Sequence, residues 1–419
     1  MNHQEIRKKF LDFFEKNGHK IVPSSSLIPE DKSVLFTTAG MQQFKPYYTN
    51  SETAPAKNVA SIQKCMRTSD IDKVGDESHL TFFEMLGNFS FGGYGKKEAI
   101  EYAYQFTTKE LGLKIDYVSV FGGEGDIPAD EESEKIWKSI DPDIEVKRFD
   151  KASNFWGPTG DEGPCGPTTE IYANGTEVWN IVFNEYYCMS DKSYRKLERL
   201  GVDTGMGLER LSAVVNGKDN IFETELFEPI IKILPTDFKD KTKRIIVDHS
   251  RAVVFLLADG VRPSNKKQGY VLRRLMRRLI TYQHLEESKS LFLNQESILG
   301  KIMEIYSEIY PEVRTMEIIS EFKKERDIFN KTLKQGLNKF NDFVLRQEPK
   351  KGKIGVAHDQ KILYGTDAFY LYQSFGFPRE VMKDLCEENN IIFDEIGFEE
   401  EFKKHQEKSR ASLEKKFKK

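Results

Sequence analysis

Closely spaced glycines in the segment 201–210 (GVDTGMGLER) precede a helix-forming sequence that contains Arg210. Glycine lets the backbone approach a ligand closely, and an arginine offers a rigid fork for phosphate or a flat face for stacking on a base. The segment therefore indicates a nucleotide site. A glycine-rich strand-to-helix turn whose arginine forms a surface salt bridge is an equally good interpretation of this segment taken alone.

Arg67 is a second candidate for phosphate chemistry. It follows Gln63–Met66 and precedes the apolar run Phe82–Leu86, which predicts a strand, a loop and a returning strand. An arginine at the edge of such a hairpin can hold an α-phosphate while negative charge develops on it. The alternative is a cross-strand ion pair.

The segments around these arginines resemble alanyl-tRNA synthetases of the class II type. The resemblance rests on 81–92 (TFFEMLGNFSFG) and 202–210 (VDTGMGLER), and it extends over nearly the full length of the chain. Further matching segments are 154–156 (NFW), 163–167 (GPCGP), 179–183 (WNIVF), 258–261 (ADGV), 269–274 (GYVLRR) and 375–378 (FGFP). The resemblance implies that residues 24–46, the Arg67 hairpin and the Arg210 segment are the three class II motifs.

The reaction implied by the resemblance joins alanine to ATP, giving alanyl-adenylate and diphosphate, and then transfers alanine to the terminal adenosine of its tRNA. Such an in-line displacement needs positioning and charge neutralisation by arginines and Mg²⁺. Arg67 would hold the α-phosphate and the alanine carboxylate, and Arg210 would lie near the adenine and the γ-phosphate. The residues assigned to ATP are Arg67, His79, Phe83, Met85 and Arg210. Phe83 and Met85 would otherwise be core residues of an apolar strand.

The alanine site follows from the same resemblance. Asp203 would accept the alanine ammonium group, a role that suits a carboxylate in a partly dehydrated pocket. Trp156, Asn180 and Gly205 would shape the small methyl site, alongside Arg67 at the carboxylate. For Trp156 the alternative is simple core packing. The residues expected to act in catalysis itself are Arg67, Asp203 and Arg210.

The second half of the chain carries the residues assigned to RNA. Between residues 271 and 279, apolar side chains alternate with Arg273, Arg274, Arg277 and Arg278, so one helix is predicted to bury an apolar stripe and display a basic one. A basic stripe suits phosphate contacts, although an ordinary solvated face has the same pattern. By resemblance, Asn265 reads the acceptor-stem G·U pair of the alanine tRNA. It could instead cap the following helix.

Two departures from the family pattern affect these assignments. Gln373 stands where the family usually has an aspartate that helps to recognise the same wobble pair, so hydrogen bonding is kept and the charge is lost. The loop 68–80 is shorter than usual. It has Leu80 in place of a common histidine and no second arginine before His79, which puts in question the contacts of this loop with ATP or the tRNA end.

The elements that position these residues predict an α+β fold with an antiparallel sheet, followed by a mainly helical part. We expect domains at 1–236 (catalytic) and 237–419 (acceptor-stem recognition), separated near a polar, proline-bearing segment. Strands are predicted at 34–36, 81–86, 117–121 and 178–183. Helices are predicted at 5–17, 98–111, after Gly207, and at 244–258, 270–283, 295–310 and 316–345, with a loop at 349–353.

Composition limits the remaining possibilities. The net charge of −4, from 63 basic and 67 acidic side chains, confines any nucleic-acid surface to a local patch. Four scattered cysteines and the lack of a C-x-x-C pair indicate neither a disulfide framework nor a structural zinc site. No signal peptide or membrane span is recognisable, so a cytoplasmic protein is expected.

The sequence ends at Lys419 without the editing domain that typical family members carry. Because binding alone discriminates poorly among small amino acids, we expect mischarging with serine and glycine, unless a separate deacylase clears the products. Two other functions stay open. One is a tRNA-binding relative without catalysis, and the other is an enzyme that passes alanine to a carrier protein or a small molecule.

Overall fold

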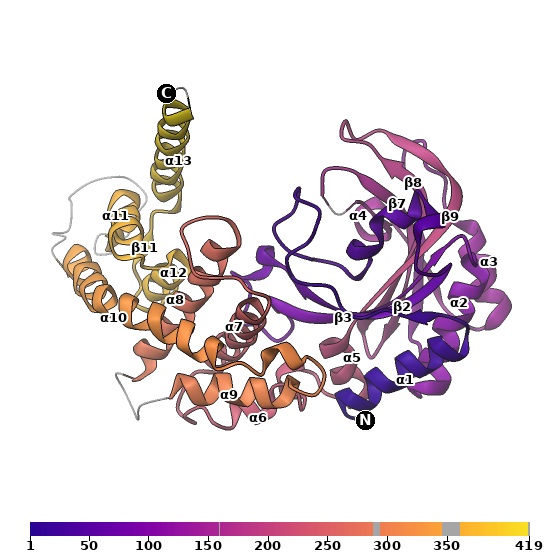
Figure 1. Ribbon diagram of the computed structural model, residues 1–419, viewed down its shortest axis with the longest axis horizontal. Coiled ribbons are helices and arrows are strands. Elements are labelled where there is room, and N and C mark those ends of the chain that lie inside the picture. Colours follow the sequence, from indigo (N-terminus) through magenta and orange to yellow (C-terminus); the bar gives the residue numbers. More distant parts are fainter. Residues whose placement is uncertain (159, 288–293, 346–360, 418–419) are drawn as a thin grey trace.

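The computed structural model describes residues 1–158, 160–287, 294–345 and 361–417 (Figure 1). It shows a strand-rich N-terminal part and a mainly helical C-terminal part. The α+β class predicted from the sequence is confirmed. The predicted loop 349–353 lies outside the described residues.

A nine-stranded sheet forms the first part, in the order β1-β2-β3-β9-β8-β7-β4-β5, with β6 paired to β7. Its central pairs are antiparallel, whereas β1/β2 and β4/β5 at the two edges are parallel. The strands are β1 (Lys20–Ile21), β2 (Asn58–Met66), β3 (Phe82–Phe91), β4 (Tyr117–Phe121), β5 (Val146–Phe149), β6 (Phe155–Trp156), β7 (Gly163–Ala173), β8 (Thr176–Cys188) and β9 (Tyr194–Gly207). Three of the four predicted strand segments lie in this sheet.

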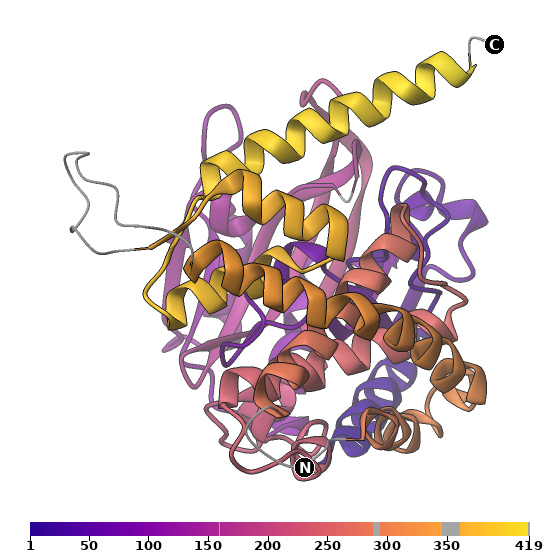
Figure 2. The same cartoon turned by 90° about the vertical axis from the view of Figure 1, so that its left-hand side faces the viewer.

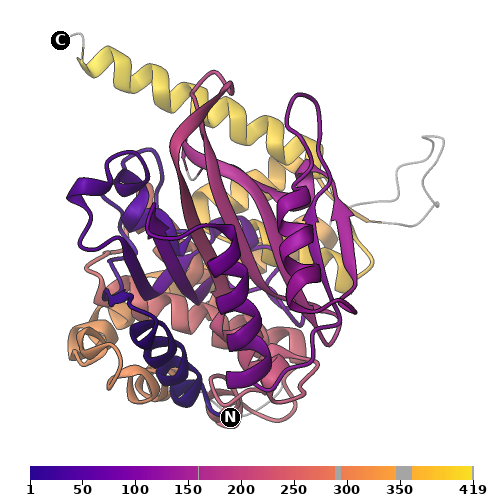
Figure 3. The same ribbon diagram turned by 90° about the vertical axis from the view of Figure 1, so that its right-hand side faces the viewer.

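Helices cover one face of the sheet (Figure 3). The helices of this part are α1 (His3–Lys16), α2 (Lys96–Gln105), α3 (Glu131–Ile140), α4 (Lys151–Asn154), α5 (Leu208–Val215) and α6 (Glu228–Ile231). A capping box between Asn2 and Glu5 begins α1, and Gly18 adopts φ +79° just beyond its end. Phe10 and Phe14 are fully buried on the inner side of α1, where both contact the Trp179 ring of β8.

The second part is built from helices (Figure 2). Its elements are α7 (Asp240–Ala258), α8 (Lys267–Glu287), α9 (Gln295–Tyr306), α10 (Met316–Leu345), β10 (Ile362–Leu363), α11 (Gly365–Phe375), α12 (Arg379–Glu388), β11 (Ile392–Phe393) and α13 (Glu395–Phe417). The helix predicted at 295–310 is shorter than expected, since Pro311 begins a separate 3-10 turn and disfavours helical backbone before it. The predicted helix 316–345 is confirmed as α10.

The two parts share a buried junction. Phe82 of β3 stacks on Phe255 of α7 with ring centroids 4.1 Å apart. Lys64 of β2 places its Nζ 2.8 Å from Asp259 Oδ1 and 2.7 Å from Glu312 Oε1. The strands that carry Arg67 and Phe83 are therefore supported from behind by the helical part.

The strand predicted at Val34–Phe36 is wrong. Asp31 turns the chain here, because its Oδ1 accepts the Ser33 amide at 2.9 Å and its carbonyl accepts the Val34 amide at 3.4 Å. The segment consequently forms bends with no strand partner. Among the described residues, no helix has the length and apolar character needed to cross a membrane.

Candidate active site and RNA interface

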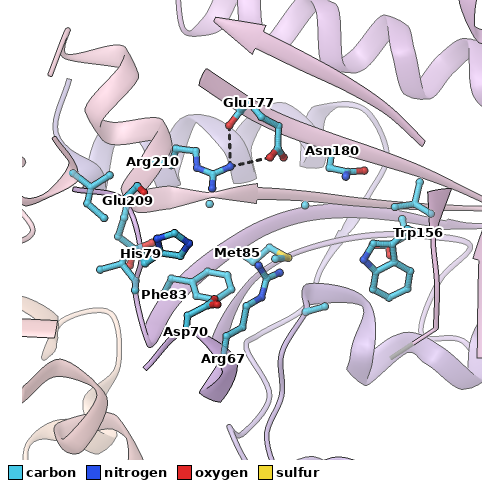
Figure 4. A pocket seen from close by; sticks show the side chains of 18 residues that line it. Arg67, Asp70, His79, Phe83, Met85, Trp156, Glu177, Asn180, Glu209 and Arg210 are labelled. Carbon is cyan, nitrogen blue, oxygen red and sulfur yellow. Dashed lines mark hydrogen bonds and ion pairs between the residues drawn. The ribbon is translucent and has the colours of Figure 1, made fainter. Parts of the chain in front are cut away.

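A pocket of about 490 Å³ opens over the sheet, and we call it the strand pocket (Figure 4). Every residue that the sequence assigned to ATP or alanine lines it: Arg67, His79, Phe83, Met85, Trp156, Asn180, Asp203, Gly205 and Arg210. Trp156 and Asn180 lie toward one end of the pocket, and His79 and Glu209 lie toward the other. The fold thus brings together residues that are up to about a third of the chain apart.

Strand register explains this convergence. Met85 of β3 is paired with Gly207 of β9, and Asn180 of β8 is paired with Gly205 of β9. Side chains alternate between the faces of a strand, so Asp203, Gly205 and Gly207 share one face. Met85 projects on that face as well, since it lines the same pocket.

Arg67 lies directly after β2 and is exposed to solvent. Its guanidinium carbon is 4.8 Å from the centre of the Phe83 ring, and its Nε donates to the Thr38 carbonyl at 3.4 Å. Within the described parts of the chain, Arg67 has no carboxylate partner. The cross-strand ion pair considered as an alternative is therefore not formed, and the guanidinium is available to an anion.

Arg210 lies in the first turn of α5 and does form the surface salt bridge considered as an alternative. Its Nη1 lies 3.0 Å from Glu177 Oε2 and donates to the Glu177 carbonyl at 3.1 Å. The Arg210 side chain is 44% exposed, and exposed pairs of this kind contribute only about 0–1 kcal/mol. A phosphate entering the pocket can therefore replace Glu177 as its partner at little cost.

Asp203 is a buried carboxylate of the pocket. It is 5% exposed, and within the described residues no donor or cation contacts its oxygens. Burial raises the pKa of Asp203 to about 8. A buried carboxylate that lacks a partner and faces a pocket suits an incoming ammonium group.

Asn180 is held in place from behind. Its Nδ2 donates to Glu170 Oε1 at 2.9 Å, and Glu170 Oε2 also accepts from the Tyr172 hydroxyl at 2.8 Å. Burial, followed by the charge of Glu177, raises the pKa of Glu170 to about 7. The Asn180 Oδ1 atom is buried and has no partner among the described residues, so it can accept a hydrogen bond from a ligand.

A second pocket, of about 720 Å³, lies between α8, α11, α12 and α13, and we call it the arginine pocket. Five residues that the sequence assigned to RNA line it, and Arg278 of the predicted basic stripe does not: Asn265, Arg273, Arg274, Arg277 and Gln373. Arg273 donates from Nη1 to Asn265 Oδ1, so the Asn265 side chain is engaged by an arginine. The pocket combines cations with an exposed amide, as an RNA interface requires.

The predicted basic stripe on α8 is only partly correct. Arg278 is 1% exposed, and it donates to the carbonyls of Ile71 and Val74 in the loop 68–80. It is therefore a structural residue of the interior. Arg277 Nε lies 2.8 Å from Glu325 Oε1, which partly neutralises it. The helical pattern correctly placed the apolar residues inward but could not show which arginines would be covered.

Comparison with known proteins agrees with this geometry. The family described as tRNA synthetases class II (A) matches residues 5–419. The chain belongs to this family. Proteins named alanine–tRNA ligase from Rubrobacter xylanophilus and Petrotoga mobilis are 39% identical to it over 99% and 98% of the chain, and 50% and 49% of their own lengths.

A third relative, the alanine–tRNA ligase of Borrelia garinii subsp. bavariensis, is 41% identical over the whole of this chain, and the match covers 74% of that relative's length. The chain thus spans about half the length of the first two relatives and about three quarters of the third. A pyrrolysyl-tRNA synthetase structure from Desulfitobacterium hafniense, at 12% identity and a TM-score of 0.35, covers 53% of this chain and 71% of its own and adds nothing to the assignment.

Two acidic residues at or next to the strand pocket were not predicted from the sequence. Glu209 lines the strand pocket and is buried, with Oε1 2.5 Å from Arg251 Nη2 and Oε2 accepting the Glu84 amide at 3.1 Å. Glu170 supports Asn180 from the neighbouring strand. Glu209 looks like an ordinary surface acid in the sequence, because its buried partner Arg251 lies 42 residues away. The partners of Glu170 are close along the chain, but no local pattern shows that this carboxylate is buried.

Proposed function

We propose that this chain activates alanine with ATP and transfers it to the 3′ end of an alanine tRNA. The observation that carries the proposal is the convergence of the residues assigned to ATP and alanine on one pocket of the sheet. Relatives that cover the whole chain bear the name alanine–tRNA ligase. Class II synthetases use ATP and Mg²⁺.

ATP fits the described side chains. Exposed Arg67 and Arg210 supply positive charge, and the Phe83 ring beneath the Arg67 guanidinium gives a flat surface for a base. Asp70 and Glu177 are carboxylates at the pocket wall that suit Mg²⁺ bound mainly through phosphate oxygens. The described residues contain no cluster of three or more metal-ligating side chains. Mg²⁺, when bound with ATP, would neutralise phosphate charge.

The protein's contribution to adenylation is positioning. Arg67 neutralises the α-phosphate while the alanine carboxylate attacks it and diphosphate leaves. Asp203 holds the alanine ammonium, with Asn180 Oδ1 as a second acceptor. The close approach of Gly205 to Met85 leaves room for only a small side chain beside them.

Transfer requires the tRNA acceptor stem in the arginine pocket. Asn265 carries both a donor and an acceptor for the edge of a base pair, and Gln373 lies in the same pocket. Arg273, Arg274 and Arg277 would contact phosphates. The phosphate contacts position the RNA, whereas the two amides select it.

Alanine-dependent exchange of diphosphate into ATP tests the activation step. We expect exchange with the purified chain. In Arg67→Ala, the kcat of exchange should fall by about 10²-fold to 10³-fold. The matched control is Arg326→Ala, which removes an arginine that pairs with Glu296 away from both pockets. A tRNA-binding relative without catalysis would show no exchange.

Aminoacylation of two alanine tRNA transcripts tests RNA recognition. We expect the chain to charge a transcript that has the acceptor-stem G·U pair. When the pair is G·C, kcat/KM should fall by an amount equivalent to about 1–3 kcal/mol. Equal charging of both transcripts would contradict G·U reading. Exchange activity without charging of either transcript would favour transfer of alanine to a carrier.

A further inference from the structure

The loop 68–80 separates the two pockets and contributes residues to both. Asp70, Ser78 and His79 line the strand pocket, whereas Asp72 lines the arginine pocket. Ile71 and Val74 are buried between these positions. The loop is therefore a direct physical connection between the proposed ATP site and the proposed RNA site.

The helical part holds this loop through charged groups. Arg274 Nη2 lies 2.6 Å from Asp72 Oδ1, and the same nitrogen contacts Glu380 of α12. Arg278 contacts the Ile71 carbonyl from the interior. Farther along the loop, Arg244 Nη1 of α7 donates to the Gly75 carbonyl at 3.3 Å.

The base of the loop is fixed to α7 as well. The Thr81 amide donates to the buried Asp248 Oδ1 at 2.9 Å, and the Arg67 amide donates to the Thr81 carbonyl at the same distance. Within the loop, Asp76 accepts from the backbone amides of Ser78 and His79. Displacement of the Asp72 end would therefore be felt inside the loop, at Asp70 and His79, rather than at the anchored Arg67.

We propose, resting on the proposed function, that Arg274 is a positioning residue for the ATP site, acting through Asp72 and the loop 68–80. The Asp72 side chain is 60% exposed and that of Arg274 is 25% exposed, so the pair lies at the surface of the arginine pocket, within reach of an RNA phosphate. A phosphate that binds Arg274 competes with Asp72 and loosens the loop. RNA in the arginine pocket thus weakens ATP binding in the strand pocket, and the effect is reciprocal.

The first test does not depend on catalysis. Hydrogen–deuterium exchange of amides 68–80 is compared among wild type, Arg274→Ala, Asp72→Asn and Arg326→Ala. The Arg326 side chain is 24% exposed and pairs with Glu296 at 3.3 Å, which makes it a close match to Arg274 in burial and pairing. We expect faster exchange of the loop in the first two variants only. Unchanged loop exchange in Arg274→Ala would overturn the proposal.

The second test measures the KM for ATP in alanine-dependent diphosphate exchange without RNA. We expect Arg274→Ala and Asp72→Asn each to raise this KM by about fivefold or more. Because both substitutions break the same contact, the KM of the double variant should not exceed that of the more strongly affected single variant. An acceptor-stem helix with a blocked 3′ end should raise the KM of wild type but not of Asp72→Asn.

The outcomes separate the two proposals. If Arg274→Ala leaves the KM for ATP unchanged and raises only the KM for tRNA, Arg274 is a plain RNA contact and the positioning role is wrong. If wild type shows no alanine-dependent exchange, the proposed function fails, and the hydrogen exchange of the loop still decides whether Arg274 positions it.

Discussion

Gly205 and Met85 lie in contact across the floor of the strand pocket: a Cβ placed on Gly205 would be 3.0 Å from Met85 Sδ and 3.6 Å from its Cε. Methionine is flexible, so its side chain can move, but only by taking space from the pocket. Adjacent strands β3 and β9 thereby set the size of the proposed amino-acid site.

We therefore expect Gly205→Ala to raise the KM for alanine by about tenfold or more, since one added methyl group costs about 1–3 kcal/mol in a filled core. Glycine activation should suffer less, because glycine lacks the methyl group that meets the shifted Met85. Diphosphate exchange with each amino acid measures both effects.

A second substitution tests the cause. Adding Met85→Ala to Gly205→Ala should restore part of the alanine activity. Gly300→Ala, at a helical glycine with open space around it, is the matched control.

Asp203→Asn should weaken alanine binding. Loss of a charge-assisted hydrogen bond to the ammonium costs about 1.5–3 kcal/mol, so the KM for alanine should rise by about 10-fold to 100-fold.

Asp203 should also set the pH dependence of alanine activation. Because burial raises the pKa of Asp203 to about 8, kcat/KM for alanine in wild type should increase with pH up to this value. A pH profile that is the same in Asp203→Asn would show that another group titrates.

The same substitution should stabilise the fold. The pKa of Asp203 is about 8 in the folded chain and about 3.9 for an unfolded aspartate, so between these values the folded state binds more protons. The wild-type free energy of unfolding consequently falls as pH rises through this window. Asparagine has no such dependence, and Asp203→Asn should melt at a higher temperature than wild type, with a larger gain at about pH 8 than at about pH 5. Thermal melts across this pH range would check the trend.

Arg251 supports the wall of the strand pocket from α7. It is completely buried, pairs with Glu209 at 2.5 Å and donates to the Tyr306 hydroxyl at 2.7 Å. Arg251→Ala leaves Glu209 as an unpaired buried charge and should lower the free energy of unfolding by about 3–5 kcal/mol. Arg326→Ala, at a half-buried pair near the surface, should cost less, about 1 kcal/mol. Urea denaturation of both variants makes the comparison, and equal losses would contradict a structural role for the Arg251–Glu209 pair.

Discrimination against serine and glycine should be limited. Serine adds one hydroxyl to alanine and glycine removes one methyl group, so binding should favour alanine by only about 10-fold to 100-fold. We expect measurable seryl-tRNA and glycyl-tRNA formation by this chain in the absence of a deacylase. Aminoacylation with each amino acid tests this, and undetectable products with both would refute it. A separate deacylase would then have nothing to clear.

Several features were readable from the sequence alone. Short apolar runs placed β3, β4 and β8, and helical apolar spacing placed α1 and α10, because burial selects apolar residues at these positions. The same patterns failed at Val34–Phe36, where a single carboxylate, Asp31, turns the backbone. Short apolar runs cannot reveal such competition.

The sequence also supplied the candidate site residues, because Arg67, Asp203 and Arg210 stand in long ordered segments that resemble one family. Only the tertiary structure decided which charges are buried and with whom they pair. Arg278 and Arg274 look equivalent along α8, yet one is interior and the other faces the arginine pocket. Burial and pairing depend on residues brought close by strand register and helix packing, such as Asp72 beside Arg274, and no local pattern encodes those distances.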